Sequence, residues 1–164
     1  MVEKFSEMTV QPGDFVSLRC TSLASPLAQI TWSVDGQAVA NSARYRFGDF
    51  VVNNGGPLMK ISSSNGINQL QSAVSRLVSH FNITSVRVED GGLYRCMAAN
   101  VAGSVAHQAR LNVYGKAAVK MHTPNATALS NSDIELNCPF YGFPLKSITW
   151  FGRGKRDCLW RSRN

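Results

Sequence analysis

The stretch that decides the fold is FNITSVRVEDGGLYRC, residues 81–96. At its start Phe81 and Ile83 flank a polar residue, and Leu93–Ala98 continue the same alternation at its end. An apolar period of two is typical of β-strands that bury one face and leave the other in water. The turn residues Glu89–Gly92 lie between the two runs, so this stretch predicts two strands joined by a connection.

An internal repeat lies outside this stretch. Residues 16–32, VSLRCTSLASPLAQITW, match residues 134–150, IELNCPFYGFPLKSITW, at a constant offset of 118 positions. In each copy a tryptophan follows a cysteine after twelve positions, so the repeat indicates two domains of one family. The identical pairs are Leu18/Leu136, Cys20/Cys138, Pro26/Pro144, Leu27/Leu145, Ile30/Ile148, Thr31/Thr149 and Trp32/Trp150.

The rest of the chain also favours strands. Val16–Cys20, Ile30–Val34 and Ala109–Val113 alternate apolar and polar residues, and glycine-containing turns separate such runs. Hydrophobic residues make up 44% of the chain and charged residues 16%, which provides material for a core and excludes a disordered, highly charged chain. We therefore expect an all-β sandwich or barrel.

The spacing around Cys96 resembles that of the I-set immunoglobulin domain. The residues that carry the resemblance are DGGLYRCMAANVAG at 90–103, and the match covers nearly all of residues 4–114. The resemblance implies an all-β, immunoglobulin-like (I-set) Greek-key sandwich over residues 1–114. An incomplete second immunoglobulin domain would follow over residues 115–164.

This resemblance implies a pinned core. Cys20 and Cys96 would form a disulfide between the two sheets, and Trp32 would pack on that bridge. Two buried free thiols, as in cytosolic proteins of this fold, are the alternative. With 76 positions between the two cysteines, the chain-entropy model gives the bridge about 4 kcal/mol.

The same resemblance assigns roles at one end of the sandwich. Tyr94 would form a tyrosine corner, in which its hydroxyl bonds to backbone a few residues upstream. Gly92 would permit a backbone conformation that a side chain resists. Asp90 would pair with Arg44, at a gain of about 1 kcal/mol or less if the pair is exposed to solvent.

Longer runs narrow the resemblance. Residues 9–20, 29–36 and 79–115 closely resemble the ectodomain of arthropod Down syndrome cell adhesion molecules, and residues 113–115 followed by 136–150 resemble the passage from the sixth to the seventh immunoglobulin domain of that family. The resemblance implies a fragment of a cell-surface receptor for homophilic cell–cell adhesion and axon guidance. Self-recognition would lie chiefly in other domains, and this domain would be mainly a structural spacer with a short junction.

One segment of the first domain departs from the family pattern. The excess length falls at about 57–77, PLMKISSSNGINQLQSAVSRL, which is rich in Ser, Asn and Gln and lacks a strand period. A surface insertion, translated non-coding sequence and extra variable-type strands all fit this stretch. In each case we expect it to be irregular, poorly ordered and outside the core.

The second domain also departs from the pattern. No second tyrosine corner supplies a partner for Cys138, and Cys158 follows too soon after Trp150 to take that place. The pairing of both cysteines therefore stays uncertain. We expect residues 116–164 to form about three strands and an open half-sandwich.

Charge and motifs exclude several classes of function. Of the net charge of +7, +4 comes from the last twelve residues, which hold five basic residues and Asp157, and the earlier basic residues are scattered along the chain. We therefore expect no nucleic-acid partner. His80, His107 and His122 lack metal-ligand spacing, and no catalytic motif is present, so we expect no enzyme activity, no metal and no cofactor.

The expected location is the extracellular side of the plasma membrane. Two N-glycosylation sequons begin at Asn82 and Asn125, and Asn82 alternates outward between two buried residues, so its side chain should face water. Met1–Phe5 lack the plan of a secretory signal, and no run reaches the roughly 18 apolar residues of a membrane span. Membrane attachment would therefore come only through other parts of a longer protein.

Two other functions fit the same residues. A cytoplasmic muscle-type I-set scaffold would keep Cys20 and Cys96 reduced and would leave both sequons bare. A secreted immune immunoglobulin protein would not differ from an adhesion receptor over this stretch. Mass measurement under non-reducing conditions separates the scaffold from the receptor, because a linked cysteine pair with sugar at Asn82 supports the receptor.

Overall fold

The structure, a computed structural model, describes residues 3–52, 75–120, 127–152 and 155–160. Over these ranges the chain is almost entirely β-structure, with one short 3-10 helix, and it contains no helix long and apolar enough to cross a membrane. The elements are β1 (Met8–Val10), β2 (Val16–Ala24), β3 (Gln29–Val34), β4 (Gln37–Ala38), β5 (Tyr45–Val52), β6 (Ser75–Ile83), η1 (Val88–Asp90), β7 (Gly92–Asn100), β8 (Gly103–Val113), β9 (Ala118–Val119), β10 (Phe140–Tyr141), β11 (Ile148–Gly152) and β12 (Lys155–Trp160).

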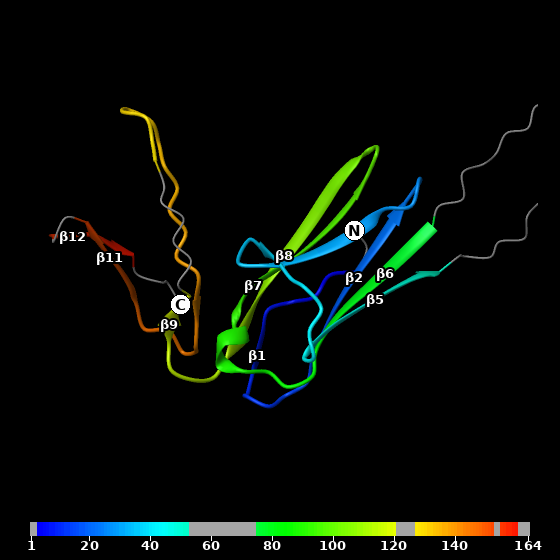
Figure 1. Cartoon of the computed structure of the whole chain (residues 1–164), viewed down its shortest axis with the longest axis horizontal. Coiled ribbons are helices and arrows are strands. Elements are labelled where there is room, and N and C mark those ends of the chain that lie inside the picture. Colours follow the sequence, from blue (N-terminus) through cyan, green and yellow to red (C-terminus); the bar gives the residue numbers. More distant parts are fainter. Residues whose placement is uncertain (1–2, 53–74, 121–126, 153–154, 161–164) are drawn as a thin grey trace, which may run out of the picture.

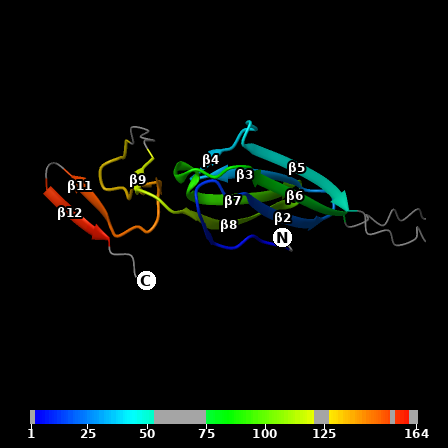
Figure 2. The same cartoon turned by 90° about the horizontal axis from the view of Figure 1, so that it is seen from below.

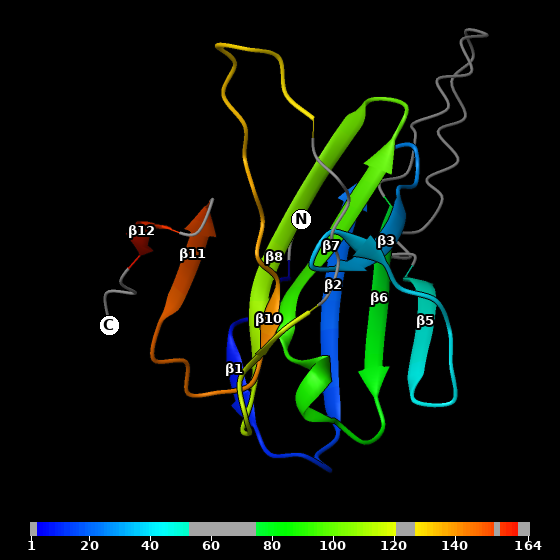
Figure 3. The ribbon, with the colours of Figure 1, turned by 60° about the vertical axis from the view of Figure 1, so that its left-hand side comes forward.

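Strands β1–β8 form two sheets that pack face to face (Figure 1). One sheet has the order β1-β8-β7-β3-β4, with β1 parallel to β8 and every other pair antiparallel. The second sheet has the order β2-β6-β5 and is antiparallel, with β6 in the middle (Figure 3). The predicted all-β immunoglobulin-like sandwich is confirmed.

The core forms where the inward faces of these sheets meet. Along β2, Val16, Leu18 and Cys20 are buried, whereas Ser17 and Arg19 are exposed, as the period of two predicts. The aromatic side chains at the centre come from both sheets and contact one another around Phe81. The buried apolar residues of this core are Phe5, Val16, Leu18, Cys20, Ala28, Ile30, Trp32, Leu77, Phe81, Ile83, Val86, Tyr94, Cys96, Ala98, Leu111 and Val113.

The last residues of the segment 57–77, which was expected to be irregular, form part of a β-strand. Most of it lies outside the described residues, but Ser75–Leu77 form the first residues of β6 and pair with β2 and β5. Leu77 is 7% exposed and belongs to the core. The expectation of irregular structure is therefore wrong for Ser75–Leu77, and the expectation that the stretch lies outside the core is wrong for Leu77.

Residues after 115 form a second unit beyond one end of the sandwich (Figure 2). Its described part contains four strands, in the antiparallel pairs β10-β9 and β11-β12, where about three were expected. Residues 134–138 repeat the sequence of β2 but form no strand, and Ile134 and Leu136 are about half exposed. The two copies differ because β2 forms backbone hydrogen bonds with β6, whereas no described strand pairs with residues 134–138.

Candidate functional site: the base of the sandwich and its junction with the second unit

A covalent bridge joins the two sheets. Cys20 of β2 and Cys96 of β7 form a disulfide with 6.6 Å between their Cα atoms. Trp32 lies directly across the β3–β7 ladder from Cys96, and its indole Nε1 donates a 2.9 Å hydrogen bond to Oγ of Ser79. The sequence alone does not predict this role of Ser79. Its only signal was a hydroxyl at an inward position of a strand, where a buried polar group needs a partner.

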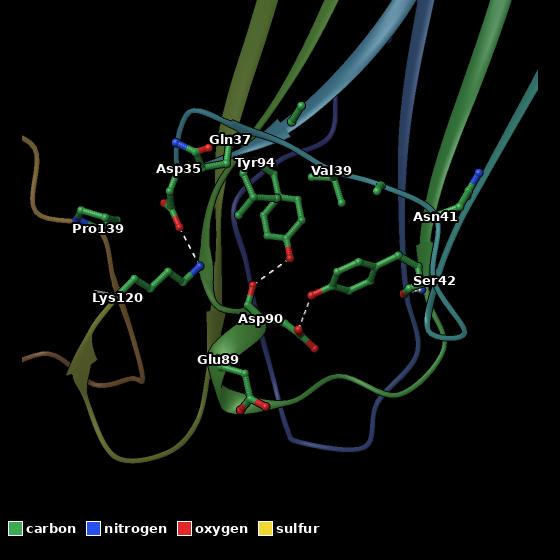
Figure 4. A pocket seen from close by; sticks show the side chains of 14 residues that line it. Asp35, Gln37, Val39, Asn41, Ser42, Glu89, Asp90, Tyr94, Lys120 and Pro139 are labelled. Atoms are coloured by element: carbon green, nitrogen blue, oxygen red, sulfur yellow. Dashed lines mark hydrogen bonds and ion pairs between the residues drawn. The ribbon is translucent and has the colours of Figure 1, made fainter. Parts of the chain in front are cut away.

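The end of the sandwich nearest the second unit carries a hydrogen-bonded cluster around Asp90, which we call the base cluster (Figure 4). Tyr94 donates a 2.7 Å hydrogen bond from its hydroxyl to the carbonyl oxygen of Asp90, which is the geometry of a tyrosine corner. Arg44 donates from Nη1 to the Asp90 carboxylate at 2.6 Å. The hydroxyl of Tyr45 and the backbone N–H of Arg87 donate to the same carboxylate.

The base cluster holds a buried charge. The side chain of Asp90 is 1% exposed and that of Arg44 is 25% exposed, so the pair is not the solvent-exposed contact that would contribute little. Burial alone would raise the pKa of Asp90, but the hydrogen bonds from Arg44, Tyr45 and Arg87 outweigh it and lower that pKa. Burial, together with the bond to Asp90, raises the pKa of Tyr45 to about 12.

A second carboxylate connects the sandwich to the second unit. Asp35, in the turn between β3 and β4, accepts a 2.8 Å hydrogen bond from the backbone N–H of Leu93 and pairs with Nζ of Lys120 at 2.6 Å (Figure 4). A Cβ on Gly92 would lie 2.5 Å from Oδ2 of Asp35 and 2.8 Å from Nζ of Lys120. Gly92 is therefore required for this close approach. The expected reason, an unusual backbone conformation, is wrong, because the glycines with positive φ lie elsewhere in the described chain.

Aromatic contacts also hold the junction. The guanidinium of Arg110 lies 3.7 Å from the ring centroid of Phe140, and its Nη2 donates to the Phe140 carbonyl oxygen at 2.9 Å. Burial lowers the pKa of Arg110. Tyr114 forms an isolated backbone bridge with Phe143, and their rings meet edge to face at 5.4 Å. These contacts join β8 and the residue that follows it to the second unit.

A cavity of about 530 Å³ opens at this junction, lined in part by Asp35, Glu89, Asp90, Lys120 and Pro139 (Figure 4). Its lining contains no histidine or cysteine, and the two tyrosine hydroxyls that reach it both bond to Asp90. Across the described part of the chain, no group of three or more His, Cys, Asp or Glu side chains is placed to hold a metal ion. The arrangement is suited to positioning two units and provides no nucleophile with a base beside it.

The remaining candidate residues lie apart from the junction cluster. Asn82 is half-buried on β6, and its Oδ1 is enclosed without a hydrogen-bond partner among the described residues, so its amide faces water less than expected. Asn125 lies outside the described residues. Cys138 is a free, half-exposed thiol. Cys158 lies on β12, opposite Trp150 of β11.

Comparison with known proteins gives consistent matches. The family model described as an immunoglobulin domain matches residues 1–100. The chain is 36% identical over 157 residues to cell adhesion molecule Dscam2 of Drosophila melanogaster and 34% identical over 151 residues to cell adhesion molecule DSCAM of Homo sapiens. These alignments cover 96% and 92% of the chain but only 6% of each relative, so the chain spans a small part of their length.

A solved structure shows the same arrangement. The crystal structure of the N-terminal eight Ig domains of Down Syndrome Cell Adhesion Molecule isoform 1.30.30 matches 97% of this chain, and 18% of its own chain, with a TM-score of 0.76 and 32% sequence identity. The match runs through both the sandwich and the unit that follows it. The chain is nearly as similar to the human relative as to the insect relative, so the similarity extends to insect and vertebrate Down syndrome cell adhesion molecules alike. The chain belongs to the immunoglobulin domain family and, within it, is similar to the Down syndrome cell adhesion molecules.

Proposed function

We propose that this chain is part of the extracellular region of a cell-surface adhesion receptor. The observation that carries the proposal is the similarity to adhesion molecules over at least 92% of the chain. This similarity favours a receptor over a cytoplasmic scaffold or a secreted immune protein. The disulfide between Cys20 and Cys96 supports the same location, because such bonds persist in oxidising compartments. Attachment to the membrane would come from other parts of the receptor.

Within that receptor, the first domain acts mainly as a spacer that sets the direction of the next domain. The domain boundary falls near residues 114 and 115, directly after β8 ends at Val113. Asp35–Lys120 and Arg110–Phe140 contacts flank the linker, so a hinge motion would break an ion pair and a cation–π contact together. Two anchors on a short linker restrict rotation more strongly than either anchor alone.

The relative rotation of the two units tests the spacer. Nitrogen-15 relaxation of the full chain should give one rotational correlation time for amides in β2–β8 and in β9–β11, because the junction holds them as one body. The double variant Lys120→Ala/Arg110→Ala should separate the two values. Arg95→Ala, an exposed change on β7 away from the junction, is the matched control. Independent tumbling of the unmodified chain would contradict the spacer.

The recognition partner is a like receptor on another cell, with the contacts made chiefly by other domains. Beads coated with the complete ectodomain should therefore aggregate, whereas beads coated with this chain alone should stay single. Strong aggregation of beads carrying this chain alone would show that the chain itself is a recognition module. Failure of both bead types to aggregate would argue against homophilic adhesion.

A further inference from the structure

The three-stranded sheet turns basic side chains outward. Strands β2, β6 and β5 run side by side (Figure 3), and their register places three arginines and a histidine on the face that points away from the core. In the sequence these residues are scattered over more than sixty positions, so the sequence alone does not predict a surface. We call this surface the basic face, formed by Arg19, Arg46, Arg76 and His80.

The register also gives the dimensions of the basic face. Arg19 pairs across the ladder with His80, Arg46 pairs with Asn82, and Arg76 lies six residues along β6 from Asn82. With a rise of about 3.3 Å per residue, the face is about 20 Å long, and the spacing of three strands makes it about 10 Å wide. It is therefore an elongated strip, which matches a linear ligand better than a compact one.

The positive charge on this strip is partly compensated by Glu3, whose carboxylate interacts with Arg19, Arg76 and His80. Among the described residues, the acidic contact is Glu3 with Arg19 at 3.1 Å, and both side chains stay about half exposed. Arg46 is exposed and forms no ion pair within the described ranges. Nε of Arg76 is enclosed and has no hydrogen-bond partner in the described part of the chain. Asp49 alternates to the other side of β5 and does not offset this charge.

We propose that the basic face binds a sulfated polysaccharide. The planar guanidinium matches the oxygens of a sulfate group as it matches those of a phosphate, and a strip of arginines releases counterions when it meets a linear polyanion. The proposal rests on the extracellular location proposed above, which the disulfide supports. Sulfated polysaccharides are present in that location. Nucleic acid fits less well, because the exposed ring of Phe50 on this face is already stacked on His80 at 5.5 Å.

Binding of the full chain to immobilised heparin over a series of salt concentrations tests the proposal. Asn82 lies on the same face, so the unmodified chain is tested both without glycans and as secreted from eukaryotic cells, and loss of binding in the glycosylated chain would overturn the proposal. The measured quantity is the slope of the logarithm of the binding constant against the logarithm of the salt concentration. Each arginine–sulfate contact removed should reduce the size of this slope by about 1, so the double variant Arg46→Gln/Arg76→Gln should reduce it by about 2. Arg95→Gln removes an exposed arginine from the five-stranded sheet and should leave the slope unchanged.

Several outcomes would overturn the proposal. Equal binding of the double variant and the unmodified chain would assign the affinity to the basic residues after 152. An equal loss per arginine removed in the double variant and in Arg95→Gln would show a general effect of net charge. Tighter binding to duplex DNA or to anionic vesicles than to heparin would exclude a polysaccharide as the ligand. Arg46→Gln alone guards against misfolding, because this exposed side chain can be shortened without opening the core.

Discussion

The carboxylate of Asp35 and the ammonium group of Lys120 meet at 2.6 Å although 85 positions separate them in the sequence. The other oxygen of Asp35 holds the backbone N–H of Leu93, so the ion pair ties the second unit to the start of β7 and to the β3–β4 turn at once. The side chains are 9% and 24% exposed, so solvent screens this pair less than a surface contact. The junction is thus part of the packed structure of the first domain.

Gly142 should be the junction residue that is least tolerant of a side chain. Its φ is +87°, and an added Cβ would lie 2.5 Å from the Cα of Ala117 and 2.5 Å from the carbonyl oxygen of Lys116. Both neighbours are backbone and cannot turn aside, so Gly142→Ala should loosen the junction by about 1–3 kcal/mol. Hydrogen exchange at the Gly115 and Lys120 amides, which bond to the carbonyl oxygens of Phe143 and Pro139, should become about tenfold faster or more.

Gly48→Ala is the matched control for this change. Gly48 lies on β5, and an added Cβ there would meet nothing within 4 Å. In Gly48→Ala, hydrogen exchange at the Gly115 and Lys120 amides should be as slow as in the unmodified chain. Unchanged exchange in Gly142→Ala would show that the second unit does not depend on the close backbone approach seen here.

The disulfide should account for much of the stability of the first domain. Replacing Cys20 and Cys96 together by serine should lower the free energy of unfolding by about 4 kcal/mol, because the bridge closes a loop over a sequence separation of 76. Urea unfolding followed by tryptophan fluorescence measures the change. Cys138→Ser, which removes a free thiol, should leave the midpoint nearly unchanged. Equal midpoints for the double variant and the oxidised chain would contradict the bridge as a stabilising element.

The sandwich could be predicted because its signals are local. A period of two in β2, β6 and β7 indicates which residues point inward, and the resemblance to I-set domains indicates how Cys20, Trp32 and Cys96 join the sheets. These features depend on neighbours a few positions apart or on a spacing already fixed by the fold. Each of them was therefore readable without knowledge of the three-dimensional arrangement.

The junction and the basic face could not be predicted because they depend on register and close approach. Nothing in the sequence pairs Asp35 with Lys120 or Tyr45 with Asp90, since each pair forms only after the strands are aligned. The role of Gly92 was misassigned for the same reason: its neighbours come from distant segments. In the second unit, residues 134–138 repeat the sequence of β2 but lack a pairing partner in the described structure.

Glycosylation at Asn82 should shift the mass of the chain secreted from eukaryotic cells. Asn82→Gln should remove one glycan mass, and Asn125→Gln should remove another if that sequon is also used. Asn82 lies on the central strand of the three-stranded sheet, so a glycan there would cover part of the outer surface of that sheet. Identical masses for the unmodified chain and Asn82→Gln would leave this residue bare and would weaken the extracellular assignment.

Asp90→Asn should destabilise the first domain in a way that depends on pH. At pH 7 the loss should be about 3 kcal/mol, because the change removes a buried charge and leaves the partners of Asp90 unmatched. The folded state holds the pKa of Asp90 below the value in the unfolded chain, which is about 3.9. Asp90 therefore stabilises the fold above that unfolded value, and the contribution is lost as the pH falls through the lower, folded value.

Urea unfolding between pH 7 and pH 2 measures this effect. The unmodified chain should lose stability below about pH 4, whereas Asp90→Asn should lose less over the same interval, so the two curves should converge in acid. Asp49→Asn, an exposed change on β5, controls for the loss of one negative charge and should stay parallel to the unmodified chain. A constant difference between Asp90→Asn and the unmodified chain at every pH would mean that the asparagine acts through packing alone. In that case the lowered pKa of Asp90 would play no part in holding Arg44 and Tyr45 at the base of the sandwich.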